Sequence, residues 1–527
     1  MRTLFRNARI YSPSNPYATA MLVEDGVITW LGQQDGVGQF GEVQVIDTED
    51  GLITPAFVDA HVHATAAGLA LTGLDLTGAV SLAEALQRVE RATRTGRGRP
   101  ILGSGWDETA WPERRPPTAA ELDRASYGGA VYLSRVDVHS AVVSSALAAT
   151  VSGLAGLDGY RGDGLVTRAA HDAVRTAALA ALTAGQIRDA QRAALQRAAA
   201  LGIACVHEMA GPAISSPDDL TGLLSLSTEE ALPEVIGYWG ELFGIEAARE
   251  LGAIGAGGDL FCDGSLGSHT AALHEPYVDA PGGSGVLYYE TADLAEHVRQ
   301  CLAAGLQTGF HVIGDAAVDQ VLDAYELVTA ALGRSAGAGQ RLEHVEYVRD
   351  PSRLAASGLM ASMQPMFDGL WGGTEGMYSE RLGRARALQL NRFSQLASAG
   401  VPLAFGSDAP VTSLGPWQAV QAAAYPHDPG AAISPRAAFT AHSRAGWRIA
   451  GRHNEGVLEP GLPATFALWH AGETAVDAPD ERVQRWSTDP RANIPGLPDV
   501  APGADLPTCR ATLRNGIVIY DDGLLTS

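Results

Sequence analysis

Short apolar runs alternate with helical patterns through the middle of the chain. We predict strands at residues 53–60, 202–207, 234–238, 257–263, 307–311, 340–344, 359–364 and 402–408. Between them lie segments such as AGQIRDAQRAALQRAAALG, whose apolar spacing and closing glycine predict a helix before Ile203. Eight strands that alternate with helices are typical of a (β/α)8 barrel. The pattern therefore predicts an α/β fold with a TIM-like barrel formed by residues 54–70 and 200–454.

The two ends of the chain share a different pattern. TAMLVEDGVITWLG and ATLRNGIVIYDDG each read as two short strands around a turn, at Asp25-Gly26 and Asn515-Gly516. Each group is too small to bury a face alone, so we predict that residues 1–53 and 455–527 form one β-sandwich-like domain. Residues 71–199 are then a large insertion after the first barrel strand. It carries its own strands, in RPILGSGWDE and AVYLSRVDVHS, and is expected to cap the site.

Composition and charge narrow the class of protein. The chain has 527 residues, 46% of them hydrophobic, and a net charge of −23, which disfavours nucleic acid and anionic membranes as partners. Its four cysteines are widely spaced without CxxC pairs, which disfavours a disulfide framework or a cysteine zinc site. The opening MRTLFRNARIYS lacks an apolar h-region, and no run of about 20 apolar residues occurs. We expect a soluble, cytoplasmic protein with a small-molecule substrate, and a homodimer is left open.

Polar residues suited to metal binding follow the predicted strands. PAFVDAHVHA places His61 and His63 at the end of the first strand, and residues two apart in an extended chain point the same way. His311, His344 and Asp408 end three later strands. In a (β/α)8 barrel these ends form the active-site face. Any one histidine could be structural, but the ordered set of imidazoles and a carboxylate favours a zinc or similar divalent centre.

The same segments resemble a known family. PAFVDAHVHA, His311, His344 and GSDAP resemble the metal-dependent amidohydrolase superfamily. GSGWDETAW, RVDVHSAVVSSAL, DGSLGSHTA, HVIGDAAVD, RLEHVE and WSTDPR are similar to amidohydrolase family 3, a branch that includes N-substituted formamide deformylase-like proteins. The resemblance runs nearly from end to end. It implies a barrel beside a β-sandwich-like domain built from both termini.

The resemblance also implies roles for individual residues. His61, His63, His311 and Asp408 are expected to be metal ligands, and Asp408 is expected to act as general base and acid. His344 contacts the substrate in one-metal relatives and binds the second ion in two-metal relatives. A zinc ion lowers the pKa of bound water to about 7, and a positioned base typically adds ~10²–10⁴-fold.

One departure from the family bears on the number of ions. Two-metal relatives usually bridge their ions with a carboxylated lysine, but all 37 basic residues here are arginine. A lysine bridge is therefore impossible, and we predict one divalent ion per chain, zinc being expected. Asp259 or Asp263, which share one face of a predicted strand, is the alternative as a bridging ligand, with His344 as a ligand of a second ion.

Other polar residues are weaker candidates. We expect substrate contacts from a set in the insertion and the barrel loops: Trp106, Asp107, Trp111, Asp137, His139, His269 and Gln364. The alternative for the first five is packing of the insertion onto the barrel, and for His269 an exposed surface position. His207 and Glu208 favour a structural hydrogen bond, Asp315 favours capping of the next helix, and Glu346 is expected to be solvated.

These observations lead to one function and two alternatives. The predicted function is metal-dependent hydrolysis of a carbon–nitrogen bond in a non-peptide amide or an N-formyl or N-acyl compound. The first alternative is a deaminase of a cyclic substrate. Many such relatives carry Glu three residues after the fifth-strand histidine, where this chain has Gly314. The second is a catalytically silent binding or regulatory protein, which the intact set of His61, His63, His311 and Asp408 disfavours.

Overall fold

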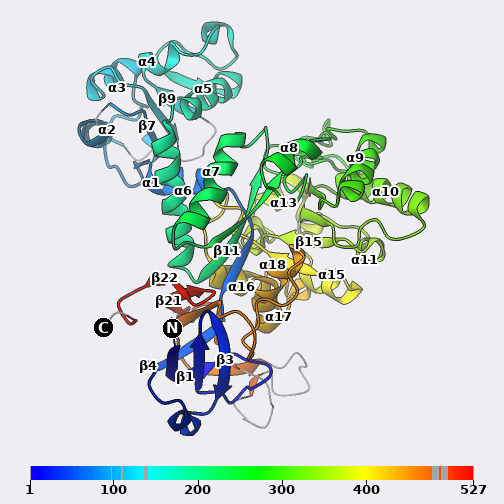
Figure 1. Cartoon of the computed structure of the whole chain (residues 1–527). Helices are drawn as coiled ribbons and strands as arrows, with labels where there is room; N and C mark the ends of the chain where they lie inside the picture. The colour runs from blue at the N-terminus through cyan, green and yellow to red at the C-terminus, as the bar shows by residue number, and fades with distance from the viewer. Residues whose placement is uncertain are drawn as a thin grey trace. The chain divides into compact units, whose positions relative to one another are not determined.

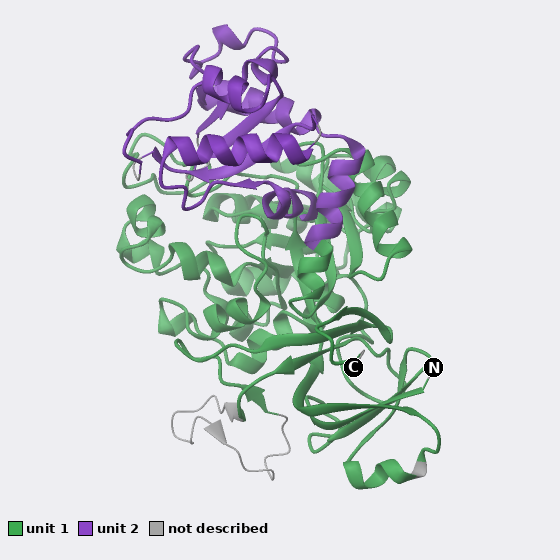
Figure 2. Cartoon of the chain, turned by 90° about the vertical axis from the view of Figure 1, so that its left-hand side faces the viewer, with its two compact units in different colours: residues 1–63, 195–527 green, residues 64–194 purple. Residues whose placement is uncertain are grey.

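The structure is a computed structural model that describes residues 2–96, 98–108, 111–135, 140–477, 486–487 and 496–525. The chain divides into two compact units (Figures 1 and 2). Unit 1 comprises residues 1–63 and 195–527, and unit 2 comprises residues 64–194. Among the described residues, no helix is long and apolar enough to cross a membrane.

Strands from both ends of the chain share one seven-stranded sheet in unit 1. Its order is β22-β21-β17-β4-β1-β2-β3. The strands are β1 (Arg2–Ile10), β2 (Ala20–Glu24), β3 (Val27–Gly32), β4 (Gln44–Pro55), β17 (Phe466–His470), β21 (Thr508–Arg514) and β22 (Ile517–Asp521). β4 pairs with β1 in parallel and with β17 in antiparallel orientation, so it joins the two ends of the chain. Phe5 and Phe466, from opposite ends, pack edge to face with ring centroids 5.1 Å apart.

The two predicted hairpin turns are confirmed. Asp25 and Gly26 have φ values of 48° and 84°, and Asn515 and Gly516 have 50° and 75°. Two successive positive φ values are what a two-residue type I′ hairpin turn requires. The turns also lie against each other, because a Cβ added to Gly26 would come within 2.5 Å of the Asn515 carbonyl oxygen. Glycine at position 26 therefore serves both the turn and this close approach.

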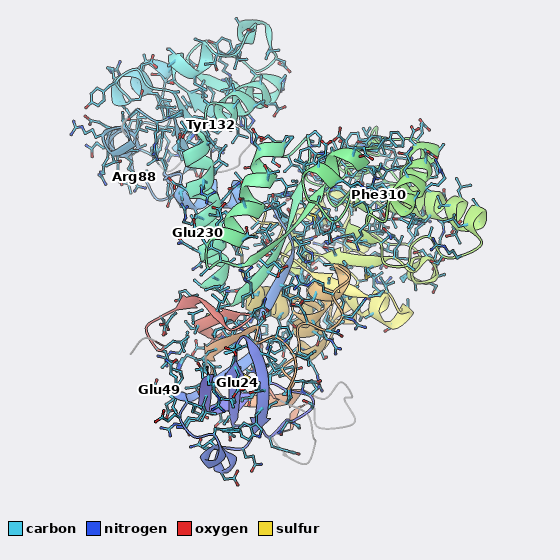
Figure 3. The ribbon with its side chains drawn as sticks, in the orientation of Figure 1. Glu24, Glu49, Arg88, Tyr132, Glu230 and Phe310 are labelled. Carbon is cyan, nitrogen blue, oxygen red and sulfur yellow. The ribbon has the colours of Figure 1, made fainter. Side chains whose placement is uncertain are left out.

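Parallel strands form the middle of unit 1. A three-stranded sheet has the order β12-β11-β5, and a four-stranded sheet has the order β13-β14-β15-β16. The strands are β5 (Phe57–Val62), β11 (Ile203–Ala210), β12 (Glu234–Trp239), β13 (Gly309–Val312), β14 (Arg341–His344), β15 (Met360–Met363) and β16 (Leu403–Phe405). A parallel bridge between Val62 and Ala409 connects the end of β5 with the chain after β16. Phe310 on β13 is fully buried (Figure 3). The fold is thus α/β with mixed sheets.

The strand predicted at residues 257–263 is wrong. Within this range only one isolated parallel bridge occurs, between Phe261 and His311, and another bridge lies just before it at Gly255. Gly258, with φ of 85°, leaves the extended conformation and interrupts any regular ladder. At Gly257 an added Cβ would lie 2.2 Å from the backbone nitrogen of Gly309. The glycines let this segment approach β13 closely without forming a strand.

Helices follow the parallel strands of unit 1. They are α7 (Pro217–Glu229), α8 (Ile245–Glu250), α9 (Thr291–Ala304), α10 (Asp315–Leu332), α11 (Pro351–Ser357), α12 (Pro365–Trp371), α13 (Met377–Leu382), α14 (Arg384–Ala387), α15 (Phe393–Ala399), α16 (Pro416–Ala424), α17 (Pro435–Ala441) and α18 (Arg444–Ile449). The helix predicted before Ile203 is confirmed as α6 (Ala184–Ala199). Asp315 is not the cap of α10 as predicted, because Gly314 holds that position. The Asp315 carboxylate instead accepts a hydrogen bond from the backbone N–H of His274.

Unit 2 has its own five-stranded sheet, in the order β10-β9-β8-β7-β6. The strands are β6 (Leu74–Asp75), β7 (Ile101–Trp106), β8 (Val131–Arg135), β9 (Ser140–Val143) and β10 (Leu165–Thr167), and the helices are α1 (Ala64–Thr72), α2 (Leu82–Gly96), α3 (Ala119–Ala125), α4 (Ser145–Ala148) and α5 (Arg168–Ala180). β7 and β8 confirm the strands predicted in RPILGSGWDE and AVYLSRVDVHS. β6, β7 and β8 are parallel, whereas β9 and β10 run antiparallel to their neighbours.

Candidate active site

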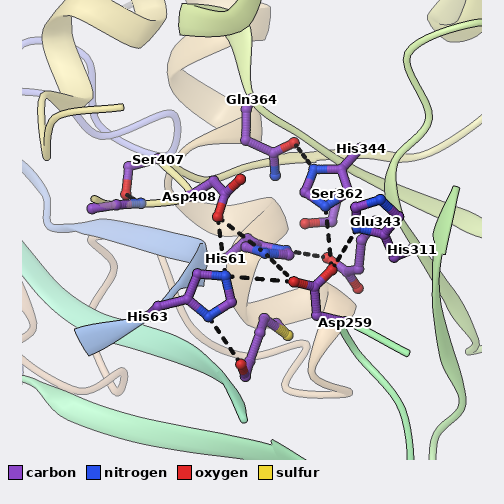
Figure 4. A network of polar contacts seen from close by, with 12 residues as sticks. His61, His63, Asp259, His311, Glu343, His344, Ser362, Gln364, Ser407 and Asp408 are labelled. Atoms are coloured by element: carbon purple, nitrogen blue, oxygen red, sulfur yellow. Dashed lines mark hydrogen bonds and ion pairs between the residues drawn. The ribbon is translucent and has the colours of Figure 1, made fainter. Parts of the chain in front are cut away.

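Two histidines at the end of β5 begin the site (Figure 4). The His61 ring is fully buried, and its Nδ1 donates a hydrogen bond of 2.9 Å to Glu343 Oε2. The His63 ring donates from Nδ1 to the Met209 carbonyl oxygen at 3.0 Å. Both rings therefore turn Nε2 toward Asp408, whose Oδ1 lies 3.5 Å from His61 Nε2 and 3.2 Å from His63 Nε2.

Asp259 lies among the four predicted histidines. Its Oδ2 is 3.8 Å from His61 Nε2 and 3.4 Å from His63 Nε2. Its Oδ1 accepts a hydrogen bond from His311 Nδ1 at 2.9 Å and lies 3.3 Å from His344 Nε2. Each oxygen of this carboxylate thus faces a different pair of rings. Sequence reasoning gave Asp259 only an alternative role as a bridge, yet the structure places it at the centre of the cluster.

The predicted ligands gather in three overlapping groups. Within each group the candidate ligand atoms lie within 4.8 Å of one another: His61, His63 and Asp259; His61, His344 and Asp408; and Asp259, His311 and His344. The structure thus brings His61, His63, His311, His344 and Asp408 into one cluster. His311 joins it through Asp259, because no described group contains His311 together with His63 or Asp408.

The donor set fits a divalent cation. His61 Nε2 and Asp408 Oδ1 are buried and have no hydrogen-bond partner, although they lie only 3.5 Å apart. Buried polar atoms are normally paired, so two unpaired ligand atoms that face each other indicate a place for an ion. Imidazole and carboxylate are the ligands that zinc and similar metals take.

The charges of the cluster agree with this fit. Burial opposes ionisation of Asp259, but His311, His344 and His61 outweigh it and hold its pKa well below the usual range. Burial likewise opposes protonation of His344, yet Asp259 raises its pKa to about 9. The pKa values of Asp259 and Asp408 are thus lowered, while those of His63 and His344 are raised. A bound cation takes the place of protons on these histidines, because metal ligands must be deprotonated.

A buried ion pair on β14 supports the first histidine, and sequence reasoning missed it. Arg341 and Glu343 are both fully buried and hydrogen-bonded to each other, and Glu343 also accepts from His61. Burial opposes ionisation of Glu343, but Arg341 and His61 outweigh it and lower its pKa to about 2. The available signal was the alternation in RLEH, where two opposite charges share one face of a buried strand.

Asp263, the other proposed bridge, is engaged with the backbone. Its carboxylate accepts hydrogen bonds from the N–H groups of Ala272, Ile313 and Gly314. Its Oδ1 lies 3.9 Å from His311 Nε2. These bonds hold the loop after β13 in place, so Asp263 supports the position of His311 and is a poorer candidate than Asp259 for holding an ion.

The described substrate-contact candidates in unit 2 have polar partners within that unit. Trp106 and Trp111 are buried in the core of unit 2, where their indole N–H groups donate to the carbonyl oxygens of Leu133 and Ala79. Asp107 forms an ion pair with Arg135 at 3.3 Å. Their polar groups thus have internal partners, which indicates a structural role for the two tryptophans. Asp137 and His139 lie outside the described residues.

The remaining candidates in unit 1 differ in position. Gln364 is buried beside the cluster, and its Oε1 accepts a hydrogen bond from His344 Nδ1 at 2.8 Å. His269 instead pairs with Asp279 at 3.0 Å and is partly exposed. The structural hydrogen bond predicted for His207 is confirmed, because Arg341 Nη1 donates to its Nδ1 at 3.1 Å. Gln364 is therefore hydrogen-bonded to a histidine of the cluster, whereas the partner of His269 is Asp279.

Glu346 is not solvated as predicted. Its side chain is 4% exposed, and its Oε2 has no hydrogen-bond partner. Burial raises its pKa to about 7. Tyr378 and Asn391 are also buried, and the Tyr378 hydroxyl interacts with the Glu346 carboxylate. The reason for the difference is that two later segments contact the loop after β14. Tyr378 on α13 interacts with the Glu346 carboxylate, and the Asn391 N–H donates to the Glu346 carbonyl oxygen.

Comparison with known proteins decides the family. A model described as the amidohydrolase family matches residues 44–520. The chain belongs to this family. A crystal structure described as an uncharacterized metal-dependent hydrolase from Pyrococcus furiosus has a TM-score of 0.75 and 28% sequence identity, and the match covers 89% of this chain and 98% of that one. Together these matches identify the chain as a hydrolase that depends on a divalent metal.

Two curated relatives cover most of the chain. Protein LONG AFTER FAR-RED 3 of Arabidopsis thaliana is 28% identical over 88% of this chain and 86% of its own length. N-substituted formamide deformylase of Arthrobacter pascens is 23% identical over 88% of this chain and 92% of its own length. The resemblance stated from the sequence motifs is thereby confirmed at the level of the family.

Proposed function

We propose that this amidohydrolase hydrolyses a carbon–nitrogen bond in a non-peptide amide, such as an N-formyl or N-acyl compound, through one zinc ion. The proposed ligands are His61, His63, His311 and Asp408. The observation that carries the proposal is a pair of buried ligand atoms without hydrogen-bond partners, His61 Nε2 and Asp408 Oδ1, which face each other 3.5 Å apart. The relative named as a formamide deformylase supports the bond class.

Different residues of the chain then carry out different steps of the reaction. The ligands would hold a divalent ion, which would supply an activated water and polarise the carbonyl group. Asp408 takes the proton from the attacking water and passes it to the leaving nitrogen. His61 and His63 help to keep the pKa of Asp408 below its usual value against the effect of burial, so it is ready as a base. His344 donates from Nδ1 to Gln364, and its role is to contact the carbonyl oxygen of the substrate.

A centre with two ions is the second candidate, and one observation favours it. The two oxygens of Asp259 face different histidine pairs, His61 with His63 and His311 with His344. A carboxylate so placed could replace the missing carboxylated lysine as a bridge. Elemental analysis of the purified protein separates the two proposals, since about one tightly held ion per chain supports the first and two support the second.

We also propose that the parallel strands close into a (β/α)8 barrel beside the terminal sheet. The support is the run of parallel bridges that continues the two parallel sheets: Val62 with Ala409, Tyr238 with Gly255, and Gly255 with Gln307. In such a barrel the site lies at the carboxyl ends of the strands, which is where His61, His344 and Asp408 occur. We further propose a small-molecule substrate and a cytoplasmic location.

Two other functions have less support. Deamination of a ring is disfavoured, because the position three residues after His311 is Gly314, where an added Cβ would lie 1.9 Å from the Ala272 carbonyl oxygen. No acidic side chain can stand there without a backbone shift. A silent regulatory protein is disfavoured by the assembled cluster of four histidines and two aspartates.

A substrate panel tests the proposal. The zinc-loaded protein is assayed against N-formyl amines, N-acyl amines, cyclic amides and aminated heterocycles, with release of formate, carboxylate or ammonia as readouts. Turnover of the N-formyl or N-acyl compounds, absent from the metal-depleted protein and from Asp408→Asn, is expected. Ammonia release from a heterocycle would establish deamination instead. No turnover from any class by protein that binds zinc would favour the silent alternative.

A further inference from the structure

Arg341 on β14 is a fully buried guanidinium with partners on three other strands. It donates from Nη2 to Glu343 Oε2 at 3.0 Å and to the Ala60 carbonyl oxygen at 2.6 Å, and from Nη1 to His207 Nδ1 at 3.1 Å. Its Nε also donates to Glu343. The guanidinium lies over the Tyr238 ring, 4.6 Å from its centroid. These contacts leave the group little freedom to turn.

Glu343 passes this restraint on to the proposed metal centre. Its Oε2 accepts from both Arg341 and His61, and its Oε1 accepts from Arg341 Nε. An ionised carboxylate can only accept hydrogen bonds, so His61 must carry a hydrogen on Nδ1. In the neutral ring Nε2 then holds the lone pair, and this atom is buried without a hydrogen-bond partner and faces Asp408 Oδ1.

We propose that Arg341 and Glu343 are positioning residues that hold His61 in the Nδ1–H tautomer, with Nε2 aimed at the metal position before any ion binds. The inference rests on the proposed metal site but not on the identity of the substrate. Arg341 fixes the carboxylate, the carboxylate fixes the tautomer and the ring plane, and the ring presents its lone pair. Partners of this kind on a ligating histidine raise its basicity and set its orientation.

Only arginine can make all of these contacts at position 341. The guanidinium makes its four hydrogen bonds in divergent directions within one plane, to Glu343 twice, to His207 and to Ala60. An ammonium group has three donors on a single atom and cannot reach these partners together. Arg341→Lys should therefore behave like a loss variant. Such behaviour separates the positioning role from a simple need for one buried positive charge.

The experiment measures zinc affinity, and not only activity. Metal-free wild type, Glu343→Gln, Arg341→Lys and the double variant Arg341→Met with Glu343→Gln are titrated with Zn²⁺ against a chelator. The expected dissociation constant rises ~10–100-fold in each variant, the usual effect of removing such a partner. Arg452→Met is the matched control, because Arg452 also stacks on an aromatic ring, 4.4 Å from the Trp447 centroid, and pairs with Glu234. Its affinity should stay within about 3-fold of wild type.

A second readout tests the tautomer directly. Proton–nitrogen NMR of metal-free protein labelled at histidine should show an Nδ1–H signal for His61 that is lost or shifted in Glu343→Gln. The double variant Arg341→Met with Glu343→Gln leaves no buried charge without a partner. Its zinc affinity is therefore the measurement to use if a single variant does not fold. Unchanged zinc affinity in folded variants, or an Nε2–H tautomer in wild type, overturns the proposal. A wild type that binds no divalent ion overturns the proposed function, while the NMR result still decides the tautomer.

Discussion

Buried polar groups behave differently in the two units of this protein. In unit 2 the indole N–H groups of Trp106 and Trp111 donate to carbonyl oxygens, and Tyr132 is hydrogen-bonded to His171 at 2.7 Å. Among the described residues of 64–194, no buried side-chain polar atom lacks a partner. Unit 1 contains all such unpaired atoms in the described part of the chain, and two of them, on His61 and Asp408, face each other. Paired polar groups support a fold, whereas unpaired ones at strand ends mark where a ligand binds.

The largest expected effect comes from Asp408, whose buried Oδ1 has no hydrogen-bond partner. Asp408→Asn should lower turnover by at least ~10²-fold, because an amide cannot take a proton from water. Zinc should be largely retained through the histidines. Rates and metal content of both proteins are measured together, with Asp319→Asn on α10 as the control, whose carboxylate pairs with Arg353 away from the cluster. Full activity of Asp408→Asn would contradict the role given to this residue.

A buried histidine of unit 1 that has a hydrogen-bond partner should contribute to stability, as the hydrogen-bonded groups of unit 2 do. His442 donates to the Val58 carbonyl oxygen, and burial lowers its pKa to about 4. The unfolded chain protonates this histidine at a higher pH than the folded protein does. The contribution of neutral His442 to the free energy of unfolding is therefore complete above about pH 6.5 and is lost as the pH falls through 4. The change corresponds to about 3 kcal/mol.

Denaturant unfolding between pH 4 and 7.5 checks this prediction. His442→Gln should lack that part of the acid loss of stability, while it lowers stability at every pH through poorer packing on Phe57, whose ring lies 5.3 Å away. The exposed His453→Gln serves as the control. The prediction fails if wild type and His442→Gln lose stability in parallel as the pH falls.

Two tryptophan substitutions compare a paired indole with an unpaired one. Trp111→Phe leaves the Ala79 carbonyl oxygen without its partner and should destabilise unit 2 by about 1–3 kcal/mol. Trp417→Phe in unit 1 removes an N–H that has no partner, so it should lose packing alone. Hydrogen exchange within each unit measures the two effects. Turnover per folded molecule should not change in Trp111→Phe, and a loss of turnover there would restore its predicted contact with the substrate.

The smallest effect is expected at Asp107. This partly exposed carboxylate pairs with Arg135 at 3.3 Å, and exposed pairs typically contribute 0.2–1 kcal/mol. Asp107→Asn should therefore shift the thermal midpoint only slightly and leave kcat/KM within about 2-fold. A large rise in KM would show that unit 2 binds the substrate and that its paired groups are not merely structural.

The sequence allowed much of this structure to be predicted, because periodicity and strand ends are local signals. The parallel strands, both hairpins and the gathering of His61, His63, His311, His344 and Asp408 were readable in this way. The central place of Asp259 was not, because the segment 257–263 reaches β13 through close glycine contacts that leave no periodic pattern.

Pairing across the fold was equally hidden from local reasoning. Trp106 and Trp111 resemble binding residues in their motif, and only the partners of their N–H groups show that they support the core. Glu346 was expected in solvent because charged residues usually lie there. Its burial depends on Tyr378 and Asn391, which come more than 30 residues later in the chain.

The strand β4 has a consequence for synthesis on the ribosome. Its second neighbour in the sheet, β17, pairs Leu468 with Ile53, so more than 400 residues must be translated before that edge is covered. At about 5–20 residues per second, this takes on the order of 20–80 s. During that time β4 presents unpaired backbone groups beside the apolar run of β5, a combination prone to aggregation. Yield in cells should therefore depend more on chaperones and on the speed of translation than the stability of the finished protein would suggest.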